Sequence, residues 1–220
     1  MTTPGRLIVF IDYQNAYMSA RETFDHQLSH YTRGQIDPWA LGESIVKLDD
    51  EARNDGETSV LHQVRLYCGL PDSRKDAAGN AARLRQVRSW GRMPGVVVSY
   101  RPLRYPREYP AQAPQEKGVD VQLAVDVIRM ALQGEYDTGV IFSRDTDLRP
   151  LLETMFDLYP KTGINCHVAT WQDDAGTRRG LRVPGKGIWC HYIGRQACNA
   201  IEDPTDYRHG SASEVLPSWR

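Results

Sequence analysis

The aspartates best suited to chemistry lie beside short apolar segments of the chain. Asp12 comes directly after the run LIVFI, and Asp145 and Asp147 come shortly after GVIFS. Asp120 stands at the start of an apolar segment with helical spacing. Carboxylates brought together repel one another unless a cation is present, and hard divalent cations prefer oxygen ligands. We therefore expect these four residues to bind Mg²⁺ or Mn²⁺, which can activate water and stabilise charge on a phosphodiester.

Each aspartate also has a structural explanation when it is taken alone. Asp147 could cap the helix that follows it, and Asp120 could stabilise a helix through its charge in the first turn. Asp12 and Asp145 could be ordinary loop residues at strand ends. Asp126 differs from all four, because it is a carboxylate within the apolar helical stretch LAVDVI. An unpaired charge there would be costly, so we expect Asp126 to have a structural partner rather than to bind metal.

Apolar segments alternate with amphipathic patterns, which predicts an α/β protein with a mostly parallel sheet and helices on both faces. The expected strands are 7–11, 62–68, 96–100, 138–142, 165–169 and 188–193. Helices are expected after Asp12, after an Asp37 cap with Pro38 in the first turn, over 76–90 and 118–133, and from 148 until Pro160 ends the last one. Ligands of such sheets bind outside the carboxyl ends of the strands, which places the aspartates at one edge.

Length and composition indicate one ordinary globular domain. The chain has 220 residues, of which 40% are hydrophobic and 25% charged. We expect a single domain over residues 1–200 and a polar C-terminal tail over 201–220. The longest early apolar run, 7–11, is too short for a signal peptide or a membrane span, so we expect a cytoplasmic protein without a membrane partner.

Cysteine and histidine spacing does not indicate a further site. The four cysteines include no CxxC pair, so neither a zinc site nor a disulfide framework is indicated. The six histidines form no spaced pair typical of a metal or general-base site. His167 and His191 fall in expected strands, where we assign them structural roles.

A locally basic stretch could contact a nucleic acid even though the formal net charge is only -1. Residues 83–107 contain seven arginines and no acid, interleaved with Trp90, Tyr100 and Tyr105. Arginine contacts phosphates, and aromatic rings stack on unpaired bases. A second basic run lies between Arg178 and Lys186. The alternative for both is a solvated surface.

Three sequence segments resemble the motifs of NYN domains, a family of PIN-like nucleases. They are FIDYQN at 10–15, KGVDVQLAVDVI at 117–128 and GVIFSRDTDL at 139–148. Their order agrees with the family, and the resemblance extends to about residue 169. It implies a Rossmann-like, PIN-type three-layer sandwich and a metal-dependent ribonuclease.

The resemblance also implies roles for individual residues. The catalytic set is Asp12, Asn15, Asp120, Ser143, Asp145, Thr146 and Asp147, with Asp12, Asp120, Asp145 and Asp147 as metal ligands and the two hydroxyls orienting them. The expected RNA-binding residues are Arg101, Arg104, Tyr105, Arg107, Lys117 and Arg144. Two positions depart from the motif usually written SGDSDF: Arg144 replaces glycine and Leu148 replaces phenylalanine. Arg144 would put a cation beside the acids, where it could hold a phosphate or replace a metal.

Three functions follow from these observations. The first is hydrolysis of RNA, expected to be single-stranded, with Mg²⁺ or Mn²⁺. The second is a catalytically weak or inactive RNA-binding module, suggested by Arg144. The third is a phosphatase with an aspartyl nucleophile, which is disfavoured because the second acid such enzymes use would be Gln14 here. The sequence leaves open the RNA target, the cleavage position, the metal preference, a homo-oligomeric state and the pathway.

Overall fold

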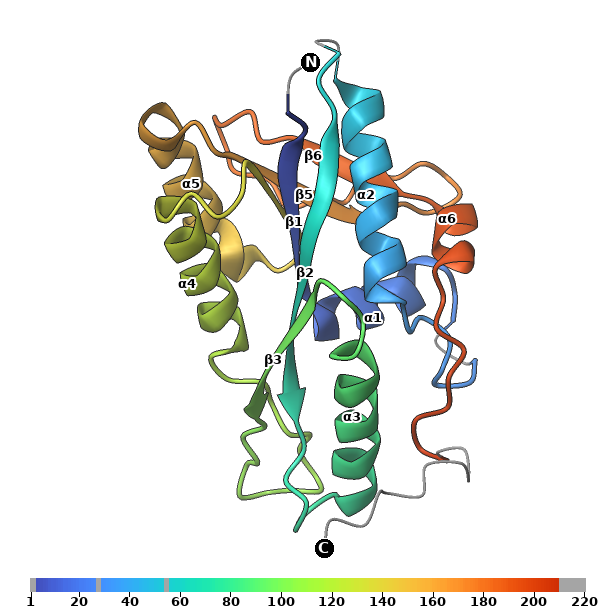
Figure 1. Cartoon of the computed structure of the whole chain (residues 1–220). Helices are drawn as coiled ribbons and strands as arrows, with labels where there is room; N and C mark the ends of the chain where they lie inside the picture. The colour runs from blue at the N-terminus through green and yellow to red at the C-terminus, as the bar shows by residue number, and fades with distance from the viewer. Residues whose placement is uncertain (1–2, 27–28, 54–55, 210–220) are drawn as a thin grey trace, which may run out of the picture.

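A six-stranded parallel sheet forms the centre of the protein (Figure 1). The structure, a computed structural model, describes residues 3–26, 29–53 and 56–209. The strands, in the spatial order β3-β2-β1-β4-β5-β6, are β1 (Gly5–Asp12), β2 (Ser59–Leu70), β3 (Val96–Pro102), β4 (Thr138–Phe142), β5 (Asn165–Trp171) and β6 (Cys190–Ile193). The helices are α1 (Tyr13–Thr23), α2 (Pro38–Ala52), α3 (Ala77–Trp90), α4 (Val119–Leu132), the 3-10 helix η1 (Thr146–Leu148), α5 (Arg149–Thr162) and α6 (Arg195–Ala200).

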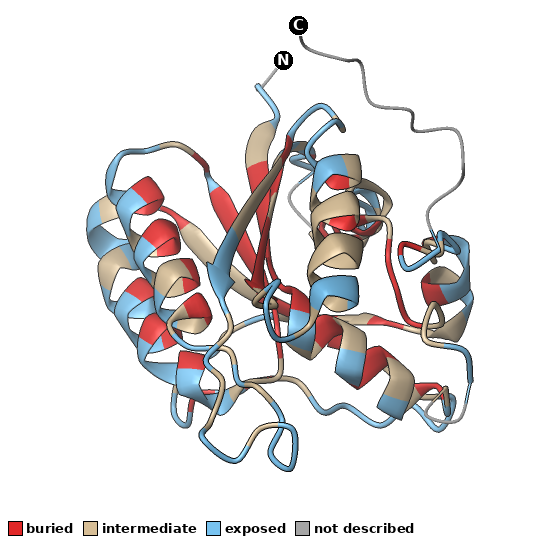
Figure 2. Ribbon diagram, turned by 90° about the horizontal axis from the view of Figure 1, so that it is seen from below, coloured by how far each residue is buried: buried red, intermediate tan, exposed pale blue. Residues whose placement is uncertain are grey.

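The sheet is the middle of three layers, so the predicted α/β architecture is confirmed. Alternate residues of β1 enter two separate cores, because side chains of a strand point to opposite faces. Leu7, Val9 and Ile11 pack with α1 and α2, whereas Ile8 and Phe10 pack with α4 and α5. Figure 2 shows the buried residues gathered on the strands and on the inner sides of the helices. Strands covered on both faces read as continuous apolar runs, as β1 does.

The direction of the connections reverses between β1 and β4. From β1 the chain continues to β2 and β3 on one side, and then crosses to β4, β5 and β6 on the other. This switch point leaves a crevice outside the carboxyl ends of the two neighbouring strands. Asp12 ends β1 and caps α1 by accepting a hydrogen bond from the Asn15 N–H. The chain therefore turns into its first helix at the mouth of the crevice.

Several element ends differ from the sequence-based expectation. The predicted end of the last long helix at Pro160 is wrong, since α5 continues to Thr162 and stops at Gly163 with φ of 68°. Pro160 has no backbone N–H to donate to the carbonyl of Phe156 four residues earlier, and Phe156 is an exposed residue of the helix. Helix α6 was not expected, because six residues are too few to show a helical period.

None of the helices within the described ranges is long and apolar enough to cross a membrane.

The described part of the expected tail, residues 201–209, packs on the domain. The backbone carbonyl of Gln35 accepts a hydrogen bond from the Asp203 N–H, and the Gln35 side chain donates to the Thr205 carbonyl. Tyr207 is buried, and Arg85 donates to its carbonyl. The rest of the expected tail, 210–220, lies outside the described residues.

Candidate active site

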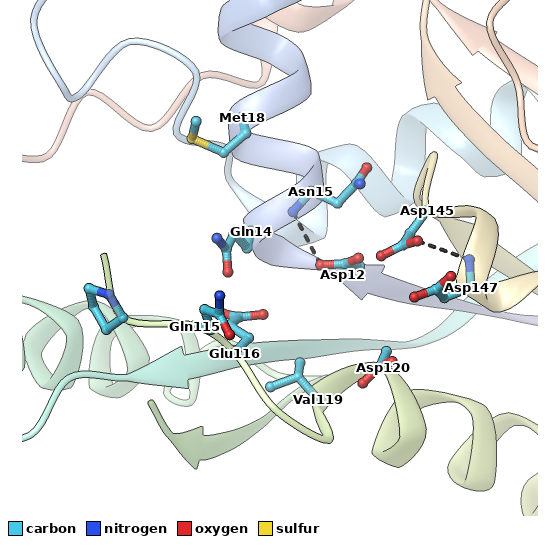
Figure 3. Close-up of a pocket in the computed structure, with 11 residues that line it drawn as sticks. Asp12, Gln14, Asn15, Met18, Gln115, Glu116, Val119, Asp120, Asp145 and Asp147 are labelled. Carbon is cyan, nitrogen blue, oxygen red and sulfur yellow. Dashed lines mark hydrogen bonds between the residues drawn. The ribbon is translucent and has the colours of Figure 1, made fainter. Parts of the chain in front are cut away.

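An open cleft of about 520 Å³ lies at the carboxyl ends of β1 and β4. The lining residues are Asp12, Gln14, Asn15, Met18, Pro114, Gln115, Glu116, Val119, Asp120, Asp145 and Asp147. The four aspartates selected from the sequence thus line one cleft. Figure 3 shows Asp12 and Asp145 facing one another and Asp120 approaching from α4. Among the residues that the structure describes, those lining the cleft include five carboxylates and no lysine, arginine or histidine.

Asp12 is buried at the base of this cleft. Its Oδ1 accepts the Asn15 N–H at 3.1 Å, and its Oδ2 accepts the Ser143 hydroxyl at 3.1 Å. Burial raises the pKa of Asp12 to about 6, the two hydrogen bonds lower it, and the nearby charges of Asp145 and Asp120 raise it further. Asp12 is therefore a carboxylate whose charge the protein alone compensates poorly.

The remaining aspartates lie at helix N-termini, where free N–H groups favour negative charge. Asp145 caps η1, with its Oδ1 accepting the Asp147 N–H at 2.9 Å. Asp120 lies in the first turn of α4, and its chain enters that helix through Gly118 with φ of 74°. Glycine adopts this left-handed conformation without strain. Three helix starts thus direct carboxylates into one space.

Ser143 and Asn15 tie the two strand ends together. Besides donating to Asp12, the Ser143 hydroxyl accepts the Asp145 N–H at 3.0 Å. The Asn15 side-chain oxygen accepts the Arg144 N–H at 2.8 Å. Ser143 therefore contacts both the Asp12 carboxylate and the backbone of Asp145. Thr146 is exposed in η1 and does not line the cleft.

The expectation that Arg144 places a cation beside the acids is wrong. Its guanidinium donates to the hydroxyls of Thr170 and Thr23 at 2.8 Å each, and to the Trp171 carbonyl at 2.9 Å. It lines a different hollow that also contains Glu22. The side chain points there because three polar acceptors satisfy it, and none of them belongs to the aspartate cleft. Arg144, which stands where the family motif has glycine, therefore does not place its side chain in the aspartate cleft.

Glu116 lies in the cleft although the sequence analysis did not select it. The Gly69 N–H donates to its Oε1, and the Gln14 amide nitrogen lies 3.1 Å from that oxygen in the orientation that satisfies both groups. Burial raises the pKa of Glu116 to about 7, and the charge of Asp12 adds to the rise. The sequence offered little to select Glu116, because it is a single acid directly before the KGVD motif and follows no predicted strand.

The expected RNA-binding residues lie around the cleft rather than in it. Arg101 lines a neighbouring hollow together with Tyr100, and that hollow shares Val119 with the cleft. Arg104, Arg107 and Lys117 are exposed and line neither the cleft nor this hollow. The Tyr105 hydroxyl accepts the Asp72 N–H at 3.2 Å, and its ring lies under the Lys75 ammonium.

Asp126 has the structural partners that its position in the sequence suggested. Its Oδ2 accepts the Tyr67 hydroxyl at 2.9 Å and lies 3.5 Å from the Arg65 guanidinium, and Gln122 donates to Oδ1 at 3.2 Å. It does not line the cleft.

Two histidines that are far apart in the sequence come together with an aspartate in the structure, although their spacing did not indicate a metal site. Asp49, His167 and His191 bring three ligand atoms within 4.8 Å of one another, which makes them a group that could hold a metal ion among the described residues. None of the three lines the aspartate cleft. The sequence could not indicate this cluster, because its members come from three elements far apart along the chain.

The fold and the cleft define an α/β protein with an acidic cleft at the switch point of a parallel sheet. The family model of the NYN domain matches residues 6–162, so this chain belongs to the NYN domain family. A search of curated proteins gave no match. Among solved structures, a protein of unknown function from Vibrio parahaemolyticus RIMD 2210633 is similar, with 17% sequence identity, a TM-score of 0.50, and coverage of 89% of this chain and 96% of that one. That likeness supports the fold.

Replacing Asp12 with asparagine is expected to stabilise the metal-free protein near neutral pH. Burial raises the pKa of Asp12 from 3.8 to about 6, so the natural protein loses stability as the pH rises through this interval, whereas uncharged asparagine does not. The advantage of the variant should therefore grow by up to about 3 kcal/mol across that interval. Urea unfolding at several pH values, with chelator present, measures it. A stability difference independent of pH would contradict the argument.

Proposed function

We propose that this protein is a metal-dependent ribonuclease. The observation that carries the proposal is the convergence of Asp12, Asp120, Asp145 and Asp147 on one open cleft. Scattered capping residues would not be expected to meet at the switch point of the sheet. Membership of the NYN family supports a nucleic-acid substrate.

The donor set fits Mg²⁺ or Mn²⁺. All its strong ligands are carboxylate oxygens, and both ions prefer oxygen over nitrogen or sulfur. Within the described part of the chain, no basic side chain lines the cleft to offset these charges. Burial, together with the charges of Asp145 and Asp120, raises the pKa of Asp12. Asp12, Asp120, Asp145 and Asp147 would hold the ion. Once bound, it would supply Lewis acidity and an activated water for attack on a phosphodiester.

The remaining groups orient these ligands and handle protons. Ser143 and the Asn15 N–H each occupy one oxygen of Asp12, which restricts its rotation. Glu116 has a pKa of about 7, raised first by burial, so its Oε2 can hold or release a proton near neutral pH. We assign Glu116 to proton transfer at the cleft.

The alternative of a non-catalytic RNA-binding module depended on a cation beside the acids. Because the Arg144 guanidinium is bound by Thr23, Thr170 and Trp171, that support is lost. RNA binding without any product at saturating metal would restore this alternative.

The test is incubation of a labelled single-stranded RNA with the purified protein. Cleavage is expected with Mn²⁺ or Mg²⁺ and not with excess chelator. Cleavage that continues in chelator, or that fails with every divalent ion supplied, would reject the proposal.

Single-stranded RNA is expected to run from the cleft over Val119 toward Tyr100 and Arg101. Arg101→Ala should weaken RNA affinity by about 3- to 10-fold and reduce the salt dependence by about 0.7 in log–log slope, because one phosphate contact is lost. Fluorescence anisotropy at several salt concentrations measures both quantities. The matched control is Arg129→Ala, an exposed arginine near the other end of α4 that pairs with Glu135. Equal losses for both variants would contradict this path.

A further inference from the structure

A second set of metal-binding side chains lies on the sheet face that α2 covers. Asp49 comes from α2, His167 from β5 and His191 from β6. Helix α2 packs mainly on β2 and also contacts β1 and β6 (Figure 1). Asp49 and His191 are buried, and the His167 side chain is 19% exposed. The three therefore form a nearly enclosed polar site within an apolar layer.

The separations of the three ligand atoms match those of a tetrahedral metal site. Asp49 Oδ1 lies 3.2 Å from His167 Nδ1 and 3.6 Å from His191 Nε2, and the two nitrogens are 3.3 Å apart. Ligands at about 2.0 to 2.2 Å from a tetrahedral ion are about 3.3 to 3.6 Å apart. Adjacent ligands of octahedral Mg²⁺ would be closer, at about 3.0 Å. The spacing therefore favours a tetrahedral ion.

The other carboxylate oxygen of Asp49 is already held by separate partners. Its Oδ2 accepts hydrogen bonds from Arg53 Nε at 3.0 Å and from the Ser59 hydroxyl at 3.1 Å. These hydrogen bonds hold Oδ2, so Oδ1 faces the two imidazoles. Hydrogen bonds from surrounding groups commonly orient metal ligands in this way.

We propose that Asp49, His167 and His191 bind one zinc ion that joins α2 to β5 and β6. Imidazole nitrogen and carboxylate oxygen are both zinc ligands, and water commonly supplies the fourth ligand of a site with three protein ligands. The site is separate from the aspartate cleft in its elements, its donor atoms and its preferred metal. It would stabilise the half of the sheet beyond β4.

The test uses Zn²⁺ and Co²⁺ alone with the full chain. After chelator treatment, one Co²⁺ per chain should bind with the intense visible absorption of a tetrahedral site, and Zn²⁺ should displace it and raise the melting temperature. The double variant Asp12→Asn, Asp145→Asn serves as the control, because it disables the oxygen-only cleft. The tetrahedral spectrum should be unchanged in this control.

Two changes at one position make the test decisive. His167→Gln should weaken Zn²⁺ affinity by at least about 100-fold. His167→Cys should keep the metal and add a thiolate-to-cobalt charge-transfer band, which a misfolded or merely destabilised protein would not produce. Absence of the tetrahedral spectrum in the natural protein, or of the new band in the cysteine variant, would overturn the proposal and leave a cluster joined by hydrogen bonds alone.

Discussion

Asp145→Asn is expected to reduce metal-dependent RNA cleavage by about 10³-fold. A metal ion contributes several kcal/mol to stabilising charge in the transition state, and each 1.36 kcal/mol is tenfold in rate. Asparagine keeps a side-chain oxygen that can accept the Asp147 N–H, so the cap of η1 should persist while the charge is lost. The measurement is kcat for a labelled single-stranded RNA at saturating Mn²⁺.

The matched control is Asp157→Asn, which removes an exposed aspartate that pairs with Lys186 on the outer side of α5. Its rate should equal that of the natural protein. Equal activity of Asp145→Asn and Asp157→Asn would eliminate the aspartate cleft as the active site.

Glu116→Gln should lower kcat and remove the pH dependence of cleavage near neutrality that the raised pKa of Glu116 predicts.

Trp171→Ala is expected to lower the free energy of unfolding by about 3 to 5 kcal/mol. Trp171 is fully buried, and its ring centroid lies 4.8 Å from that of Phe142 and 5.9 Å from that of Phe24. Its Nε1 donates to the Ala16 carbonyl at 2.8 Å, which fixes α1 against the end of β5. The substitution leaves a cavity and removes this contact. Guanidinium unfolding monitored by circular dichroism measures the loss.

The chain supplies a matched control in Trp189, a residue that is 52% exposed. Trp189→Ala should change the free energy of unfolding by less than about 0.5 kcal/mol, because surface substitutions remove few packed contacts. Similar effects of the two alanine variants would contradict the role given to Trp171. Since Asp12 caps α1, loosening α1 should also weaken metal-dependent cleavage in the Trp171 variant.

Local sequence patterns predicted the α/β architecture and the four aspartates that line the cleft. Runs such as LIVFI are apolar without alternation because both faces of a parallel strand are covered, so they identify strands directly. Asp37 and Pro38 likewise mark a helix start through purely local hydrogen bonding. Since Asp12 and Asp145 follow parallel strands, their common edge could be deduced before any coordinates were known.

Tertiary structure alone decided what each polar side chain contacts. The direction of Arg144 depends on acceptors from α1 and β5, and the enclosure of Glu116 depends on the Gly69 N–H at the end of β2. The meeting of Asp49 with His167 and His191 requires α2 to pack over two strands that follow it by more than a hundred residues. Spacing along a chain encodes periodicity within one element, whereas contacts between elements arise only when the sheet and its helices pack together.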